Sequence, residues 1–249
     1  MFKNKKGIGL IPLILIIVLV LVVGAVAIVL VLNKDNENDT DNKKETKISS
    51  NKSQNNKEQT TQKADDNEIS VQSLLQHSAS PESDFFCIED GNGGMVLEQY
   101  LGNDEIVVIP ETYKGKPIVE ISKYTFANNS PVKAIKLSNS IVKLDDFAFT
   151  LNKNLEIVIC GQNLQTIGAS TFQACDNLKE ISINDNLKHI GTLAFSQCQD
   201  LKSIHIPVTV NQIDGIAFSM MSENFAIYGK AGSVAETYAK ENSITFIAE

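Results

Sequence analysis

Arginine is absent from this chain of 249 residues, and so is tryptophan. Residues 84–249 contain 12 lysines and 20 acidic residues, and the whole chain has a net charge of −8. Recognition of phosphates and nucleotide bases depends on a basic surface and on the bidentate guanidinium group of arginine. The composition therefore argues against nucleic acid as a partner.

Cysteine and histidine are also scarce. The chain has four cysteines and three histidines, namely Cys87, Cys160, Cys175, Cys198, His77, His189 and His205. None of them has the CxxC or CxxH spacing that is typical of a zinc site. No serine or cysteine lies in a nucleophile-elbow sequence, and the acidic residues are scattered rather than paired. We therefore expect no metal, no cofactor and no enzymatic activity.

The glycine-rich segment Asp90–Gly94 does not change this expectation. It lacks the lysine of a phosphate-binding loop and the alternating acidic residues of a calcium loop. Because apolar residues flank it on both sides, we predict that it forms the turn between the two strands of a hairpin.

The most apolar part of the chain is its N-terminal end. Residues 8–32 contain no charged or strongly polar side chain. As a helix rising about 1.5 Å per residue, this stretch is long enough to cross a bilayer core of about 30 Å. Lysines precede it and acidic residues follow soon after Lys34, which favours a cytoplasmic N-terminus and an extracellular C-terminal domain. We therefore predict a single-pass cell-membrane anchor at residues 1–33.

Two alternatives to an uncleaved anchor remain open. Ala25-Val26-Ala27 has the small-x-small form of a signal-peptide cleavage site, although the apolar run is longer than usual and continues beyond it. The start Lys6–Ile11 is similar to a type IV prepilin leader, but Pro12 stands where that family has a glutamate. An uncleaved anchor remains the prediction.

Residues 34–83 are polar and of low complexity. Asn, Lys, Asp, Glu, Gln, Ser and Thr dominate, and an apolar group appears only near the end, at Ile69, Val71, Leu74 and Leu75. Such a segment cannot offset its ordering entropy by burying apolar surface. We therefore predict a disordered linker over residues 34–83, with no need for more than a helical turn or two at 69–75.

Residues 84–249 contain a repeat of 23 residues. Five copies begin at Ile118, Ile141, Leu164, Leu187 and Val210, and the ninth position is always phenylalanine, at Phe126, Phe149, Phe172, Phe195 and Phe218. Self-similarity at a fixed period indicates a solenoid, in which each unit buries its apolar face against its neighbours. We expect the five phenylalanines to form a buried ladder along the solenoid axis.

One half of each repeat has the pattern of a leucine-rich-repeat strand. Residues 178–186 place apolar side chains at the first, fourth and sixth positions and asparagine at the ninth. Ile181-Ser182-Ile183 alternates with the period of a strand that has one buried face. The other half, such as Leu187–Phe195, is too short for a regular helix and predicts an extended piece followed by a tight helical turn. The expected fold is a leucine-rich-repeat solenoid of short parallel strands and tight turns.

Residues 194–207, with the pattern A-F-S-x-C-x-x-L-x-x-I-x-I-P, resemble the bacterial surface leucine-rich repeats called BspA-like or Treponema pallidum-type. Residues 106–118 and 227–233 are similar to the first and last units of that family. The resemblance covers residues 84–249. It implies the solenoid fold and a role in adhesion to host, matrix or neighbouring-cell molecules, and it implies an unpaired cysteine at the position of Cys175 and Cys198.

The same two cysteines occupy equivalent positions in adjacent repeats, so they could also approach closely enough for a disulfide. Other repeats place Asn152 and Met221 at this position. We predict buried thiols, and a disulfide is the alternative.

Residues 231–249 are predicted to close the C-terminal end of the stack. Ser233 and Glu236 have the spacing of a capping box that opens a helix ending near Asn242. Ile244–Ile247 would then form a last strand. A solenoid needs such a cap because its final repeat has no following neighbour.

Ligand binding is expected on the strand face that points away from the core. Its outward positions are Ala134, Lys136, Ile157, Ile159, Glu180, Ser182, Ser203, His205 and Tyr228. Ile157 and Ile159 are unusual members, because an aliphatic pair facing solvent adds nothing to the core and marks a contact surface. Incidental exposure of apolar residues is the alternative explanation.

These observations predict a membrane-anchored, extracellularly displayed binding or adhesion module. Its partner would be a protein or glycan on a surface or matrix. The alternative from another class is a structural or self-assembling envelope protein that has no external ligand.

Overall fold

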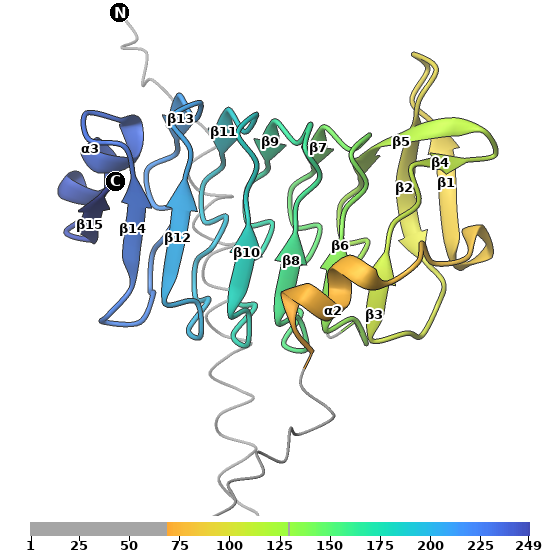
Figure 1. The fold of residues 1–249 in the computed structure, drawn as a ribbon, viewed down its shortest axis with the longest axis horizontal. Helices are drawn as coiled ribbons and strands as arrows, with labels where there is room; N and C mark the ends of the chain where they lie inside the picture. Colours follow the sequence, from red (N-terminus) through yellow and green to blue (C-terminus); the bar gives the residue numbers. More distant parts are fainter. Residues whose placement is uncertain (1–68, 129) are drawn as a thin grey trace, which may run out of the picture. The chain divides into compact units, whose positions relative to one another are not determined.

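The computed structural model describes residues 69–128 and 130–249, which form a solenoid with a cap at each end (Figure 1). Within these residues, no helix is long and apolar enough to cross a membrane. The predicted anchor at residues 1–33 and the predicted linker up to residue 68 lie outside the described part of the chain.

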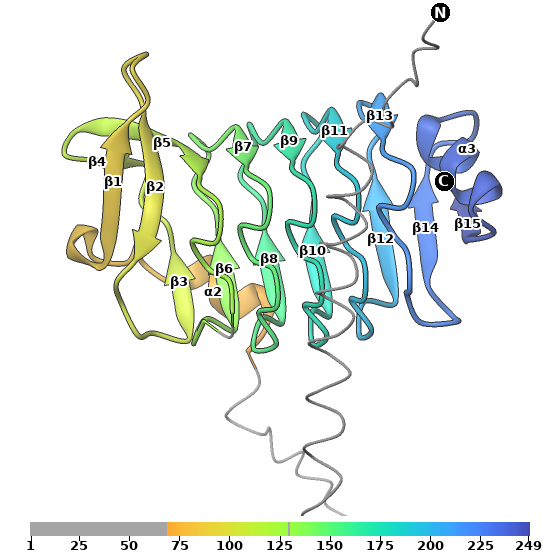
Figure 2. The same cartoon turned by 180° about the vertical axis from the view of Figure 1, so that it is seen from behind.

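Each turn of the solenoid contributes a strand to each of two parallel arrays on opposite sides of the core (Figures 1 and 2). The front array consists of β3 (Ile106–Val108), β6 (Ala134–Lys136), β8 (Ile157–Ile159), β10 (Glu180–Ser182), β12 (Ser203–Ile206), β14 (Ala226–Gly229) and β15 (Thr245–Ala248). The back array consists of β5 (Lys116–Ile121), β7 (Lys143–Leu144), β9 (Thr166–Ile167), β11 (His189–Ile190) and β13 (Gln212–Ile213). Val158, for example, pairs with Ile135 and Ile181, so equivalent residues of successive repeats are stacked.

The connection from the back array to the front array is a series of hydrogen-bonded turns rather than a single helical turn. In one repeat, Phe147 and Leu151 have left-handed backbone conformations with φ of 62° and 59°. The N–H of Thr150 bonds the carbonyl of Phe147, while the N–H of Phe149 bonds the carbonyl of Thr171 in the next repeat at 2.9 Å. Bonds between repeats therefore replace the bonds that would continue a helix.

The predicted phenylalanine ladder is confirmed. Neighbouring rings are stacked with centroids 5.1, 5.0, 5.3 and 5.1 Å apart, in the order Phe126, Phe149, Phe172, Phe195 and Phe218. All five side chains are buried. Offset stacking adds to the free energy that each ring gains by leaving water. The ladder therefore links every repeat to the next through the centre of the core.

Cys175 and Cys198 are buried free thiols, as predicted, and the alternative disulfide is not formed. Their Sγ atoms donate to the carbonyl oxygens of Phe149 and Phe172, each at 3.2 Å. Each acceptor belongs to the preceding repeat. The recurring cysteine thus adds a weak hydrogen bond between turns without a charged or strongly polar group in the core.

The N-terminal cap is an antiparallel hairpin. It consists of β1 (Phe85–Glu89) and β2 (Met95–Tyr100), of which β2 pairs in parallel with β5. Strand β4 (Thr112–Tyr113) pairs antiparallel with the start of β5, at Lys116 and Pro117. The connecting segment Asp90–Gly94 is the predicted turn. Asp90 Oδ1 accepts the N–H groups of Asn92 and Gly94 at 2.7 and 2.8 Å, and these bonds hold the pKa of the Asp90 carboxyl below its usual value.

The C-terminal cap has the predicted helix and strand, but only half of the predicted capping box is formed, because the Glu236 carboxylate accepts the N–H of Gly232 instead of that of Ser233. Helix α3 (Val234–Glu241) begins at the N-cap Ser233, whose hydroxyl accepts the N–H of Glu236 at 3.3 Å. Strand β15 follows and pairs in parallel with β14. Tyr238 of α3 meets the end of the phenylalanine ladder edge-on, at 5.8 Å from Phe218. Phe225 also stacks on Phe218, with ring centroids 5.5 Å apart, so Phe225 and Tyr238 together contact the last phenylalanine of the ladder.

In the described residues, two short helices precede the N-terminal hairpin, in a segment that the sequence assigned to the disordered linker. Helix α2 (Val71–Gln76) is followed by the 3₁₀ turn η1 (Glu82–Asp84). Ser70 and Ser73 form a reciprocal capping box at the start of α2. Figure 1 shows α2 crossing the front array over β3, β6 and β8. Residues 69–83 thus belong to the folded domain, because their apolar side chains bind the solenoid.

Candidate binding face

The outward-pointing side chains of the front array form two columns along the solenoid axis. The strand register places in one column Ile106, Ala134, Ile157, Glu180, Ser203, Ala226 and Thr245, and in the other Val108, Lys136, Ile159, Ser182, His205, Tyr228 and Ile247. The step from β10 to β12 follows the 23-residue period. We call these positions the outward face. All nine residues predicted to bind a ligand lie on it, and the structure therefore brings them onto one surface.

The chemistry of the outward face changes along the axis. Over β3, β6 and β8 every position except Lys136 is apolar. Over β10 and β12 every position carries a polar side chain. The face therefore has an apolar part toward the N-terminal cap and a polar part toward the C-terminal cap.

Helix α2 covers the apolar part. Leu74 is fully buried and packs in one cluster with Val108, Ala134, Ile157 and Ile159. The exposed fractions of Ile157 and Ile159 are only 5% and 9%. The expectation that this aliphatic pair faces solvent is therefore wrong, because it did not include a helix from the preceding segment. Ile157 and Ile159 are aliphatic because they form part of the surface against which α2 packs.

A short strap connects α2 to the N-terminal hairpin. Within it, the N–H of Ser80 donates to the carbonyl of Val108 at 2.8 Å, and the Ser80 hydroxyl accepts the N–H of Val108 at 3.1 Å. Val108 lies on β3, the edge strand of its sheet. This pair of bonds occupies part of an edge that would otherwise present unpaired backbone groups.

The polar part of the outward face is open. Glu180, Ser182, Ser203 and His205 are exposed, and Tyr228 is half-buried. The side chain of His205 lies within an ion-pair distance of the Glu249 carboxylate, with 3.1 Å between Nε2 and Oε2. These residues offer hydroxyl, imidazole, phenol and carboxylate groups on adjacent strands. None of them is needed to fill the core.

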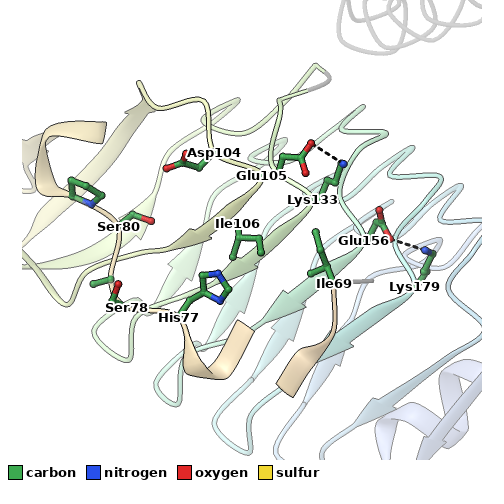
Figure 3. Close-up of a pocket in the computed structure, with 12 residues that line it drawn as sticks. Ile69, His77, Ser78, Ser80, Asp104, Glu105, Ile106, Lys133, Glu156 and Lys179 are labelled. Atoms are coloured by element: carbon green, nitrogen blue, oxygen red, sulfur yellow. Dashed lines mark hydrogen bonds and ion pairs between the residues drawn. The ribbon is translucent and has the colours of Figure 1, made fainter. Parts of the chain in front are cut away.

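A groove of about 1080 Å³ lies beside α2 (Figure 3). One wall is formed by Ile69 and by residues 77–81, and Ile106 also lines it. The opposite wall carries a row of alternating charges at the residues that immediately precede β3, β6, β8 and β10. In this row Glu105 pairs with Lys133 at 2.8 Å and Glu156 with Lys179 at 2.6 Å. We call Glu105, Lys133, Glu156 and Lys179 the charge row.

The outward face and the groove are suited to reversible binding through hydrogen bonds and apolar contacts. In residues 69–128 and 130–249, His, Cys, Asp and Glu form no group of three or more that could hold a metal ion. The four thiols lie in the core, where burial raises the pKa of Cys87 to about 11 and that of Cys160 and Cys175 to about 12. These thiols are protonated at neutral pH, when a nucleophilic cysteine would be a thiolate.

Comparison with protein families finds the BspA type leucine rich repeat region in residues 107–237, in six copies. This match includes slightly more than half of the chain. The chain belongs to the BspA-type leucine-rich repeat family. The resemblance inferred from the repeat motif is thereby confirmed. The phenylalanine ladder and the nine residues predicted to bind a ligand all lie within the BspA-type region.

One solved structure agrees with this assignment at the level of the fold. A leucine-rich repeat protein of T. pallidum is 24% identical, with a TM-score of 0.58 over 61% of this chain and 71% of that one. A leucine-rich repeat protein from Bacteroides ovatus is 28% identical, with a TM-score of 0.47, and the match covers 67% of this chain and 40% of that one. Comparison with curated proteins finds no match.

Proposed function

We propose that this protein displays its BspA-type solenoid outside the cell and that the polar part of the outward face binds a protein or glycan of another surface or matrix. Leucine-rich repeats of the BspA type are general protein-interaction modules. The observation that carries the proposal is the open polar surface of β10 and β12, where the outward side chains are exposed and fill no part of the core.

The location outside the cell is supported by the sequence. Residues 8–32 are uncharged, lysines precede them and acidic residues follow them. In this arrangement, residues 34–68 separate the anchor from the folded domain. Protease treatment of intact cells tests the topology. We expect release of fragments from the repeat domain, and full protection of the domain would contradict display outside the cell.

Binding is tested with intact cells that express the full chain, using collagen, fibronectin and mucin as immobilised probes. A face variant carries Ser182→Lys and Ser203→Lys, and a control variant carries Gln165→Lys and Asn211→Lys. All four residues are exposed, and the control positions flank the back array. We expect the face variant to bind the probe at least about tenfold more weakly than the control variant. An unpaired lysine in the contact would remove hydrogen bonds and would have to lose its water. Equal binding by both variants would exclude the polar part of the outward face as the binding site.

The alternative is a structural protein that assembles with itself. One feature favours it: β1 is the edge strand of its sheet, and it exposes Phe86 and Ile88, each 45% accessible. An edge strand with exposed apolar side chains is a template for pairing with another chain. This second function would be supported if the full chain associates with itself, if Phe86→Lys abolishes that association, and if the chain captures none of the probes.

A further inference from the structure

The apolar part of the outward face is a binding site for a helix, and α2 is its present occupant. Four side chains of the front array, Val108, Ala134, Ile157 and Ile159, form a shallow apolar surface into which Leu74 projects. In the solenoid alone this surface would face solvent. It therefore fits an amphipathic segment with a leucine at the position of Leu74.

Helix α2 is held by few contacts. It has only six residues, a length at which a helix is not stable in water without tertiary contacts. Leu74 is its only fully buried side chain, whereas Val71 and the preceding Ile69 are only partly buried. The groove between the strap and the charge row leaves additional space along one side of the helix (Figure 3). The helix can therefore leave its site without unfolding the repeats.

The strap that follows α2 permits a large displacement. Residues 77–84 separate the end of α2 from β1. The Asp84 carbonyl accepts the N–H of Leu101 at 2.7 Å and the Glu82 carboxylate accepts the N–H of Lys114, so residues 77–81 are the part that can extend. Five residues can span up to about 17 Å when extended. Most of these residues are exposed, and Ser80 supplies the bonds that tie the strap to β3. Once the Ser80 bonds open, α2 can reach a surface outside its own chain.

We propose that α2 exchanges between two copies of this chain, so that the helix of each copy occupies the apolar part of the outward face of the other. A second copy is the occupant that the structure supports, because the sequence of α2 already fits this surface. The exchanged form keeps the contacts of Leu74 with the apolar cluster and loses the two Ser80 bonds to Val108. Reciprocal exchange fills both sites in a two-fold dimer. The polar part of the outward face stays free, so the exchange is independent of the adhesive function and compatible with it.

The test is a complementation between two variants of the full chain, purified in detergent with micelles in excess. Leu74→Ser leaves an intact site with a defective helix, while Ile157→Ser with Ile159→Ser leaves an intact helix with a defective site. Each variant also carries Glu223→Cys at an exposed position for a donor or acceptor dye, since the four native cysteines are buried. We expect energy transfer in the mixture to indicate association at least about tenfold tighter than that of either variant alone.

The matched control replaces Leu74→Ser by Leu75→Ser. Leu75 is 47% exposed and does not belong to the apolar cluster, so this variant keeps its own helix in place and should not associate with the site variant. If the Leu74→Ser mixture associates no more than the two variants separately, while both retain the melting temperature of the repeats, the exchange is excluded.

A second measurement uses no destabilising variant. Isotopically light and heavy copies of the chain, each with a photoreactive residue at the exposed Gln72, are mixed, warmed and cross-linked. Exchange predicts that about half of the links between α2 and the front array join a light chain to a heavy chain. Links confined to chains of the same isotope would overturn the proposal.

Discussion

The hydroxyl oxygen of Tyr238 accepts the backbone N–H of Phe218 at 3.1 Å, while the edge of the Tyr238 ring packs against the ring of Phe218. One side chain of the C-terminal cap thus satisfies a buried donor of the last repeat and covers the last phenylalanine of the ladder. The cap is therefore joined to the repeats by a specific polar bond as well as by apolar packing.

Tyr238→Phe should lower the free energy of unfolding by about 1–3 kcal/mol, because it keeps the ring but leaves the N–H of Phe218 buried and unpaired. Denaturant titration measures the change. The control is Tyr228→Phe, since Tyr228 is half-buried and its hydroxyl makes no hydrogen bond within residues 69–128 and 130–249. Its effect should stay within about 0.5 kcal/mol. Equal effects of both substitutions would refute the structural role of the Tyr238 bond.

Phe172→Ala should destabilise the repeat domain by about 3–5 kcal/mol, because it opens a cavity between two stacked rings. Thermal unfolding followed by circular dichroism measures the loss. Phe86→Ala removes the same number of atoms from a side chain that is 45% exposed, so it should cost much less. A melting temperature of the Phe172→Ala variant within a degree or two of the parent would contradict the ladder.

Gly161→Ala should destabilise the solenoid by about 1–3 kcal/mol, since a Cβ at this position would overlap the carbonyl oxygen of Ser138 in the preceding repeat. Gly215→Ala is the matched control, because a Cβ there would meet no atom within 4 Å. Urea titration of both variants separates the close approach of two backbones from the general effect of replacing glycine. Equal urea midpoints for Gly161→Ala and Gly215→Ala would contradict the close approach of Gly161 to Ser138.

Alkaline pH should weaken the fold through its buried thiols. Burial raises the pKa of Cys160 to about 12 and that of Cys87 to about 11, whereas an unfolded thiol has a pKa of about 8.5. A raised pKa means that the folded state binds the proton more tightly, so this contribution is fully present below about pH 8.5 and is lost as pH rises toward the folded pKa.

The measurement for this prediction is the urea midpoint between pH 8 and pH 11, compared between the parent and Cys160→Ala. The midpoint of the parent should fall more steeply, because the variant has no thiol to ionise at this position. At pH 8, the intact chain should also react with a thiol reagent far more slowly than the unfolded chain. Identical pH profiles of parent and variant would count against the burial of Cys160.

The repeat period made most of the solenoid predictable. Once Phe149 and Phe172 are recognised as equivalent, stacking of successive turns follows, and so does the placement of Cys175 and Cys198 in the core. The capping-box spacing at Ser233 also sufficed to predict α3. These features depend on local patterns that recur or that involve residues a few positions apart.

Helix α2 on the outward face was not predicted, although the sequence contains a helix signal. Val71, Leu74 and Leu75 have the i, i+3, i+4 spacing of a helix, and Ser70 stands at the N-cap position. The polar composition of the preceding residues outweighed this short pattern. Nothing in the sequence of α2 indicates that its partner is the pair Ile157 and Ile159, because that contact joins segments about 80 residues apart.

The turns of the back half were unpredictable for another reason. Phe147, Leu151 and Leu193 adopt left-handed backbone conformations that side chains of this size disfavour. Propensity gives no signal for such a position. The hydrogen bonds between neighbouring repeats impose the conformation, and they exist only after the turns have stacked.

The phenylalanine ladder has a mechanical consequence. The described chain enters the solenoid at α2 and β1, whereas β12 and β14 lie toward the opposite cap (Figure 2). A ligand held on those strands and a pull from the N-terminal side would load the turns between them in series. Tension would then pass through each ring contact in turn, and the weakest contact between two neighbouring turns would set the force at which the domain yields.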